Sequence, residues 1–472
     1  DDYDKSLISK GGGVFARTAK SIPLSPEVRA MLGVEDEALP PAELIRAILK
    51  AEVELLYLGG IGTYVKAASE SNAEAGDKAN DAVRVDATEL RAKVVGEGAN
   101  LGFTQAGRIS FARTGGRIDT DAIDNSAGVD TSDHEVNIKI LLGRAITDGT
   151  LASDDRNPLL ASMTDEVGAH VLHHNYDQTL GLSLQEANAP AELEAHGAFM
   201  LDLERKGRLN RTVEGLPRAQ ALADLRAAGR GLTRPELAVI TAYGKLELSA
   251  AIVSSPVVDD PYFFRTLKAY FPEALGRFED EMGRHRLRRD IVATVLANAV
   301  VDKAGPTFAS RILTALDCDV ASFVTAFETA RQVFRLDETW REVDGQDYRI
   351  PAAAQSALYQ ELARALRGQT YWLAQRAERS HVGVQALIDA YRPTVDVLQT
   401  HGLELLSAFE RDAVIARCRA FADAGAPEGL ASRIALLRAL TGATGVADLA
   451  RELDWPPEAM ARLYNETGSA LG

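Results

Sequence analysis

Short apolar runs alternate with helix-like stretches along the first part of the chain. Residues 53–58 form one apolar run and residues 93–95 form another, and both stop at glycines. Residues 41–49 place apolar side chains at the three- and four-residue spacing of one helix face. A repeated order of helix, buried strand and glycine is typical of a parallel α/β sheet. We expect a further strand at residues 109–113 and a surface loop at residues 70–82.

Strand patterns fade after about residue 130, where helical periodicity takes over. One apolar stripe of this kind is formed by Leu358, Leu362 and Leu366. The periodicity weakens near residues 186–196. We therefore expect two domains, an α/β domain at residues 1–188 and a mostly α-helical domain at residues 189–472.

Composition and charge exclude several classes of protein. The 472 residues include 52 Lys and Arg against 68 Asp and Glu, a formal charge of −16. Nucleic-acid binding needs a basic surface, and no apolar run approaches the roughly 20 residues of a membrane span. The two cysteines, Cys318 and Cys418, are too few for a metal quartet or a disulfide framework. We expect a cytoplasmic protein without nucleic-acid or membrane partners.

Two glycine-rich turns follow the predicted strands. Gly59 and Gly60 end the first strand, at the position where ligands approach the edge of a parallel sheet. The second turn ends at Asn100, whose amide can match a planar carboxamide with a donor and an acceptor. In both cases an ordinary turn is the alternative interpretation.

The segment from Asn125 to Glu135 predicts a helix start. Ser132 and Glu135 have the S-x-x-E spacing of a capping box. A helix N-terminus carries free N–H groups and partial positive charge, so it suits a substrate carboxylate that Ser132 can also contact. Asp130 and Asp133 add negative charge nearby, and a plain capped helix is the alternative.

A histidine cluster is a further candidate site. It consists of His170, His173 and His174, with Glu166 four residues before the first of them. Zinc is conceivable there, but the H-E-x-x-H arrangement with its general base is missing. We expect partly buried histidines or a hydrogen-bonded cluster between domains, and no metal site.

Four long segments carry a family resemblance. They are LGGIGTYVKA, ELRAKVVGEGANLGFTQAGRI, NSAGVDTSDHEVNIKI and GLTRPELAVITAYGKLEL. Together they resemble the large bacterial NAD-dependent glutamate dehydrogenases, and the similarity covers most of the chain. The resemblance implies that residues 1–188 are part of a Rossmann-like domain that binds NAD. It also implies a mostly α-helical domain after it, with L-glutamate and 2-oxoglutarate as the reactants.

The resemblance implies roles for six residues. Cofactor contacts are implied for Asn100, Asn125, Gly59 and Gly60. Ser132 is implied to contact the substrate carboxylate, and Val129 to line the same pocket. By this resemblance, the carboxylate expected at the helix start belongs to glutamate.

Other parts of the family's active site are expected before residue 1. We find neither the family's catalytic lysine and aspartate nor its glycine-rich dinucleotide-binding motif. Residues 11–16 formally match G-x-G-x-x-A, but no predicted strand precedes them and no long helix follows them. We therefore assign no catalytic residue and expect a fragment that is inactive alone. The parent enzyme is expected to be a homo-oligomer that oxidises L-glutamate with NAD. The alternative is a non-catalytic regulatory or oligomerisation role for the helical part of the same enzyme.

Overall fold

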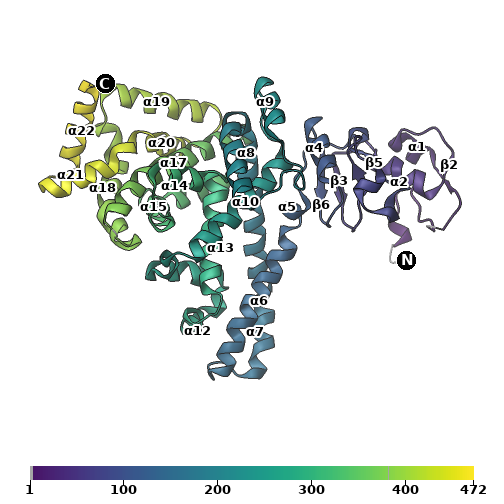
Figure 1. The fold of residues 1–472 in the computed structure, drawn as a ribbon, viewed down its shortest axis with the longest axis horizontal. Helices are drawn as coiled ribbons and strands as arrows, with labels where there is room; N and C mark the ends of the chain where they lie inside the picture. The colour runs from purple at the N-terminus through teal and green to yellow at the C-terminus, as the bar shows by residue number, and fades with distance from the viewer. Residues whose placement is uncertain (1–3, 17, 381, 472) are drawn as a thin grey trace. The chain divides into compact units, whose positions relative to one another are not determined.

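The computed structural model describes residues 4–16, 18–380 and 382–471. Its contacts divide the chain into two compact units. The amino-terminal unit comprises Asp1–Glu135 and Val167–Ile240, and the carboxyl-terminal unit comprises Val136–Glu166 and Thr241–Gly472. The strands lie in the purple to blue part of the chain, and helices make up most of the rest (Figure 1).

Two pairs of short parallel strands form the sheet structure of the amino-terminal unit. One pair is β3 (Leu55–Leu58) with β6 (Val94–Glu97), and the other is β4 (Val65–Lys66) with β5 (Val85–Asp86). A third, antiparallel pair is β1 (Ile22–Pro23) with β2 (Ala38–Leu39). The parallel pairing of β3 with β6 confirms that the two apolar runs are strands of a parallel sheet.

The strand β3 is buried on one face only. Leu58 belongs to a core cluster with Val65, Val95 and other apolar residues. Leu55 and Tyr57 are instead 55% and 65% exposed. The expected buried strand is therefore covered on one face only, because a continuous apolar run does not reveal whether both faces of a strand are covered.

Residues 109–113 belong to a helix, so the strand predicted there is wrong. The helix is α4 (Gln105–Arg113), and the side chain of Thr104 caps it by accepting the N–H of Gly107. A Cβ on Gly107 would lie 3.1 Å from the backbone of Lys66, so glycine lets α4 approach β4 closely. A five-residue apolar run does not distinguish a strand from a helix. Here the Thr104 cap and the close packing against β4 favour the helix.

Three long helices contain residues both inside and outside the amino-terminal unit. They are α6 (Ser126–Thr147), α8 (Thr164–Arg205) and α10 (Arg234–Val253). The helix α8 runs without interruption through residues 186–196 and includes Pro190. The division at residue 188 stays a prediction.

Short helices complete the amino-terminal unit. They are α1 (Pro26–Leu32), α2 (Pro41–Leu49), α3 (Asn72–Ala75), α5 (Asp121–Asp124) and α9 (Ala219–Ala227). The side chain of Ser25 caps α1 by accepting the N–H of Val28. The helix α3 lies within residues 70–82, so that segment is more ordered than the predicted loop.

The described part of the carboxyl-terminal unit contains helices and no strand, which confirms the prediction of a mostly helical second half. Its helices are α7 (Arg156–Ser162), α11 (Phe264–Tyr270), α12 (Glu279–Gly283), α13 (Arg288–Ala304), α14 (Phe308–Leu316), α15 (Val320–Val333), α16 (Leu336–Asp344), α17 (Ala352–Ser380), α18 (Val384–Leu405), α19 (Ala408–Asp423), α20 (Glu428–Leu437), α21 (Ala443–Leu453) and α22 (Pro457–Leu471). The helices α15 and α17 pack closely against each other. The predicted stripe of Leu358, Leu362 and Leu366 is buried on α17. Within the described residues, none of the helices is both long and apolar enough to cross a membrane.

Leu362→Ala should destabilise the carboxyl-terminal unit. Leu362 is fully buried, and its truncation leaves a cavity that costs about 2–5 kcal/mol of the free energy of unfolding. The control is Leu246→Ala on α10, where the leucine is 66% exposed. Denaturant unfolding followed by circular dichroism compares the two variants, and equal losses would contradict the core position of Leu362.

Candidate functional site

The carboxyl ends of β3 and β6 lie next to each other and carry the first candidate residues. The last residues of the two strands are opposite each other. The N–H of Ala99 donates to the carbonyl oxygen of Leu58 over 3.1 Å, so the turn after β6 lies against the end of β3. Gly59, Gly60 and Asn100 therefore share one edge of the sheet. Ligands bind beyond this edge in parallel sheets.

Asn100 and Asn125 meet although 25 residues separate them. The Nδ2 atom of Asn125 donates to the Oδ1 atom of Asn100 over 3.3 Å. Asn100 is exposed on the turn after β6, and Asn125 lies between α5 and α6. Two of the four predicted cofactor residues are thus in direct contact.

A buried ion pair lies next to this turn. Arg108 of α4 donates to both carboxylate oxygens of Glu97, over 2.6 Å and 2.9 Å. The N–H of Phe103 also donates to Glu97, over 3.0 Å. Burial alone would lower the pKa of Arg108, but Glu97, Asp121 and Asp124 outweigh it and raise that pKa above its ordinary value. The guanidinium group therefore remains charged inside the protein.

Two carboxylates of α5 connect the turn after β6 to the start of α6. The N–H of Leu101 donates to Asp121 over 2.8 Å, and the N–H of Glu97 donates to Asp124 over 2.8 Å. Leu101 has a φ of 65°, a conformation that is strained for residues other than glycine. Asp121 thus holds a strained backbone directly beside Asn100.

Asp124 titrates close to neutral pH. Burial raises the pKa of its carboxyl group from 3.8 to about 7. The N–H of Glu97 and the charge of Arg234 oppose the rise, whereas the negative charges of Asp119 and Glu97 add to it. The interior beside the sheet edge can therefore gain or lose one negative charge near neutral pH.

The start of α6 differs from the prediction. The helix begins at Ser126, and the hydroxyl of Ser132 donates to the carbonyl oxygen of Gly128 over 3.2 Å, within the helix. The predicted capping box of Ser132 and Glu135 is therefore wrong, because the chain is already helical before it. In the first turn, the N–H of Gly128 donates to the carbonyl oxygen of Asn125 over 3.1 Å, and Val129 and Ser132 are exposed on the first turns.

The predicted histidine cluster is divided in the structure. Glu166 accepts the N–H of Glu273, and His173 lies near Asp177 of its own helix. His174 instead contacts Asp130 of α6, over 2.8 Å. Asp130 was not part of the predicted cluster, so the sequence did not indicate this contact between α6 and α8.

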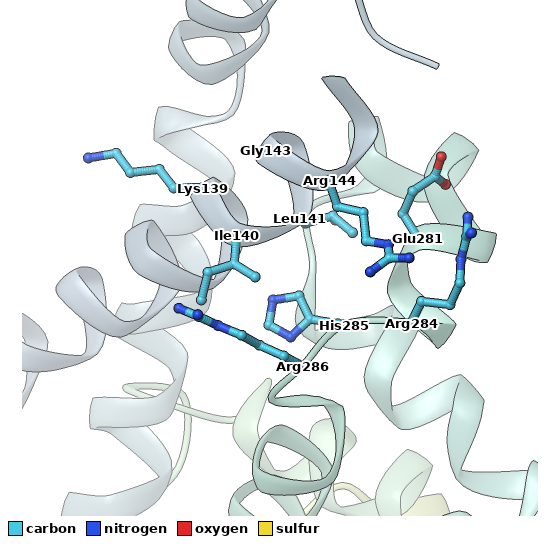
Figure 2. Close-up of a pocket in the computed structure, with 9 residues that line it drawn as sticks. All are labelled: Lys139, Ile140, Leu141, Gly143, Arg144, Glu281, Arg284, His285 and Arg286. Atoms are coloured by element: carbon cyan, nitrogen blue, oxygen red, sulfur yellow. The ribbon is translucent and has the colours of Figure 1, made fainter. Parts of the chain in front are cut away.

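A separate hollow of about 310 Å³ lies within the carboxyl-terminal unit (Figure 2). Its cationic lining side chains include Lys139, Arg144, Arg284 and Arg286. Arg144 and Arg284 both pair with Asp148, over 3.4 Å and 3.2 Å. Figure 2 shows Lys139 directed away from the other lining side chains. Because Arg144 and Arg284 are paired with Asp148 and Lys139 is turned away, we assign no ligand to this hollow.

Sequence reasoning missed the polar groups that support the site. Glu97, Arg108, Asp121 and Asp124 were not candidates. An acidic residue at the end of an apolar strand, such as Glu97, was the available signal, since a buried carboxylate needs a partner. The partner, Arg108, could not be identified because its burial depends on how α4 packs.

Two sequence models of protein families match most of the chain. Residues 1–185 match the family described as "Bacterial NAD-glutamate dehydrogenase, catalytic domain". Residues 229–472 match the family described as "Glutamate dehydrogenase, C-terminal".

Three relatives named "NAD-specific glutamate dehydrogenase" are similar to the chain. The protein of Halomonas elongata is 41% identical over 472 residues, and that of Pseudomonas aeruginosa is 43% identical over 471 residues; each alignment covers 100% of this chain and 29% of the relative. The protein of Mycobacterium tuberculosis is 43% identical over 440 residues, which cover 92% of this chain and 27% of the relative. The chain thus spans less than a third of the length of these relatives.

Asp124→Asn should weaken the pH dependence of stability. The pKa of Asp124 is about 7 in the folded chain against an ordinary 3.8, so the folded state keeps a proton that the unfolded state loses between these values. This contribution is fully present below the unfolded pKa and is lost as the pH rises through the folded pKa. Asparagine retains the acceptor oxygen for the N–H of Glu97 without the charge.

Thermal unfolding at about pH 5 and about pH 8 tests this expectation. The melting temperature of the unsubstituted chain should fall more over this interval than that of Asp124→Asn. The control, Asp36→Asn, removes an exposed carboxylate of the same unit and should behave like the unsubstituted chain. An equal fall in the Asp124→Asn variant would show that Asp124 does not hold the proton.

Proposed function

Because this chain belongs to the bacterial NAD-glutamate dehydrogenase family, we propose that it forms part of a cleft in which L-glutamate is oxidised with NAD. The reaction converts L-glutamate, NAD⁺ and water into 2-oxoglutarate, ammonium, NADH and a proton. The single observation that best supports this proposal is the hydrogen bond between Asn100 and Asn125 at the carboxyl ends of the parallel strands.

The asparagine pair suits the nicotinamide end of NAD. A carboxamide offers one acceptor and two donors, and asparagine amides complement both. The bond from Asn125 to Asn100 still leaves an N–H on Asn100 and an acceptor oxygen on Asn125 for a ligand. Gly59 and Gly60 allow a cofactor to approach the same edge. NAD supplies the hydride acceptor in this chemistry, and we assign β3 and β6 to part of a Rossmann-like domain.

The first turns of α6 suit the substrate. Val129 and Ser132 are three positions apart in the sequence, so they lie on the same side of the helix. Ser132 offers a hydroxyl, and the first turn adds the partial positive charge of a helix N-terminus. Asp130 and Asp133 are close by in sequence, so glutamate also needs cationic partners. By resemblance to the family, these are lysines expected outside this chain.

We propose a separate, non-catalytic role for the helical carboxyl-terminal part. Residues 229–472 match a family model of their own, and α15 and α17 form a closely packed core there. An assembly module that supports a homo-oligomer fits these observations. Light scattering of the 472-residue chain tests this role, and a strictly monomeric species would count against it.

Ser132→Ala should raise the KM for glutamate far more than the KM for NAD. The measurement uses initial rates of NADH formation by a polypeptide of the relatives' full length that contains this sequence. The matched control is Thr131→Ala, which removes a neighbouring hydroxyl that also donates to a carbonyl of α6, that of Ala127, over 2.7 Å. Loss of a substrate contact should appear in Ser132→Ala alone.

Two outcomes would contradict the assignment. Equal effects of Ser132→Ala on both KM values, or none, would exclude the substrate role of Ser132. The 472-residue chain is assayed in parallel and should be inactive, because the proposal places the catalytic lysine outside it. Glutamate-dependent NADH formation by this chain alone would overturn that part of the proposal.

A further inference from the structure

Three side chains from two helices converge within the amino-terminal unit. Asp130 and His134 are one turn apart on α6, and His174 belongs to α8. The Nδ1 atom of His174 lies 2.8 Å from Asp130 Oδ2, and the Nε2 atom of His134 lies 3.7 Å from Asp130 Oδ1. One ligand atom of each residue lies within 4.8 Å of the other two.

His134 is the buried member of this group. Its side chain is completely buried, and its ring stacks on that of His174 with centroids 5.8 Å apart. The ring of His170 is 5.9 Å away on another side.

We propose that Asp130, His134 and His174 bind one divalent metal ion of the zinc type. Two imidazoles and a carboxylate are ligands that Zn²⁺ prefers, and three protein ligands leave a fourth position open for water. Zinc bonds of about 2.0–2.2 Å in a tetrahedral site place ligand atoms about 3.3–3.6 Å apart. His174 and His134 lie 2.8 Å and 3.7 Å from different oxygens of Asp130. A bound ion would draw one atom of each residue, all now within 4.8 Å of one another, to the zinc spacing.

The two helices are already held together beside these residues. Asn175 of α8 donates to the hydroxyl of Ser126 over 2.9 Å and to the carbonyl oxygen of Ile123 over 3.1 Å. A metal ion bound by Asp130, His134 and His174 would connect α8 to the turns of α6 that carry Val129 and Ser132. The site stands on its own geometry and does not depend on the proposed function.

Metal titration of the 472-residue chain tests the proposal. The chain is first treated with a chelator and then titrated with Zn²⁺ in a calorimeter, where one ion should bind per chain. Co²⁺ should give the visible absorption bands of a four-coordinate ion with nitrogen and oxygen ligands. If hydrogen bonds alone hold the cluster together, the titration should show no stoichiometric Zn²⁺ binding. That result would overturn the proposal.

Variants at the exposed end of the cluster identify the ligands. His174→Ala and Asp130→Asn should each weaken Zn²⁺ binding by more than about 10-fold. The matched control is His173→Ala. His173 is next to His174 in sequence but lies near Asp177, so this variant should leave the affinity for Zn²⁺ unchanged. Circular dichroism of each variant establishes that it is folded. Equal affinity in all three variants would show that the ion binds elsewhere and would also overturn the proposal.

Discussion

The buried ion pair of Glu97 and Arg108 is the constraint on which the candidate site depends. A buried charge without its partner costs several kcal/mol, so the end of β6 and the helix α4 must keep their relative positions. Glu97 also accepts the N–H of Phe103 and donates its own N–H to Asp124. One residue thus links a strand, the turn after it and two helices. The position of Asn100 follows from these links, because it lies within the turn that they enclose.

The same constraint extends to α6 through the carboxylates of α5. Asp121 and Asp124 hold the turn after β6 by their bonds to Leu101 and Glu97, and Asn125 follows them directly. The helix α6 starts at the next residue and carries the candidate substrate residues and two of the proposed metal ligands. The proposed cofactor contact, the proposed substrate contact and the proposed metal site therefore all lie at or near one helix start. The pKa of Asp124, raised by its burial, makes the charge of this region sensitive to pH near neutrality.

Several features could be predicted from the sequence, and the errors have physical reasons. Two strands ending in glycine and a long series of amphipathic helices were recognised, because their patterns reflect burial that repeats along the chain. The strand at residues 109–113 was wrong, since a short apolar run fits either structure until Thr104 and the packing of α4 are known. The cap at Ser132 was wrong because an S-x-x-E pattern can also occur inside a helix, where the serine donates to a preceding carbonyl oxygen.

The chain's own residues determined its family, most of its strand and helix content, and which asparagines and serine were candidates. These properties depend on local spacing and on long motifs. Only the tertiary structure decided that Asn100 contacts Asn125, that Glu97 is neutralised by Arg108, and that His174 lies beside Asp130. Each of these contacts joins residues that are distant in sequence. Whether such residues touch depends on how strands and helices pack, and local sequence patterns do not specify that packing.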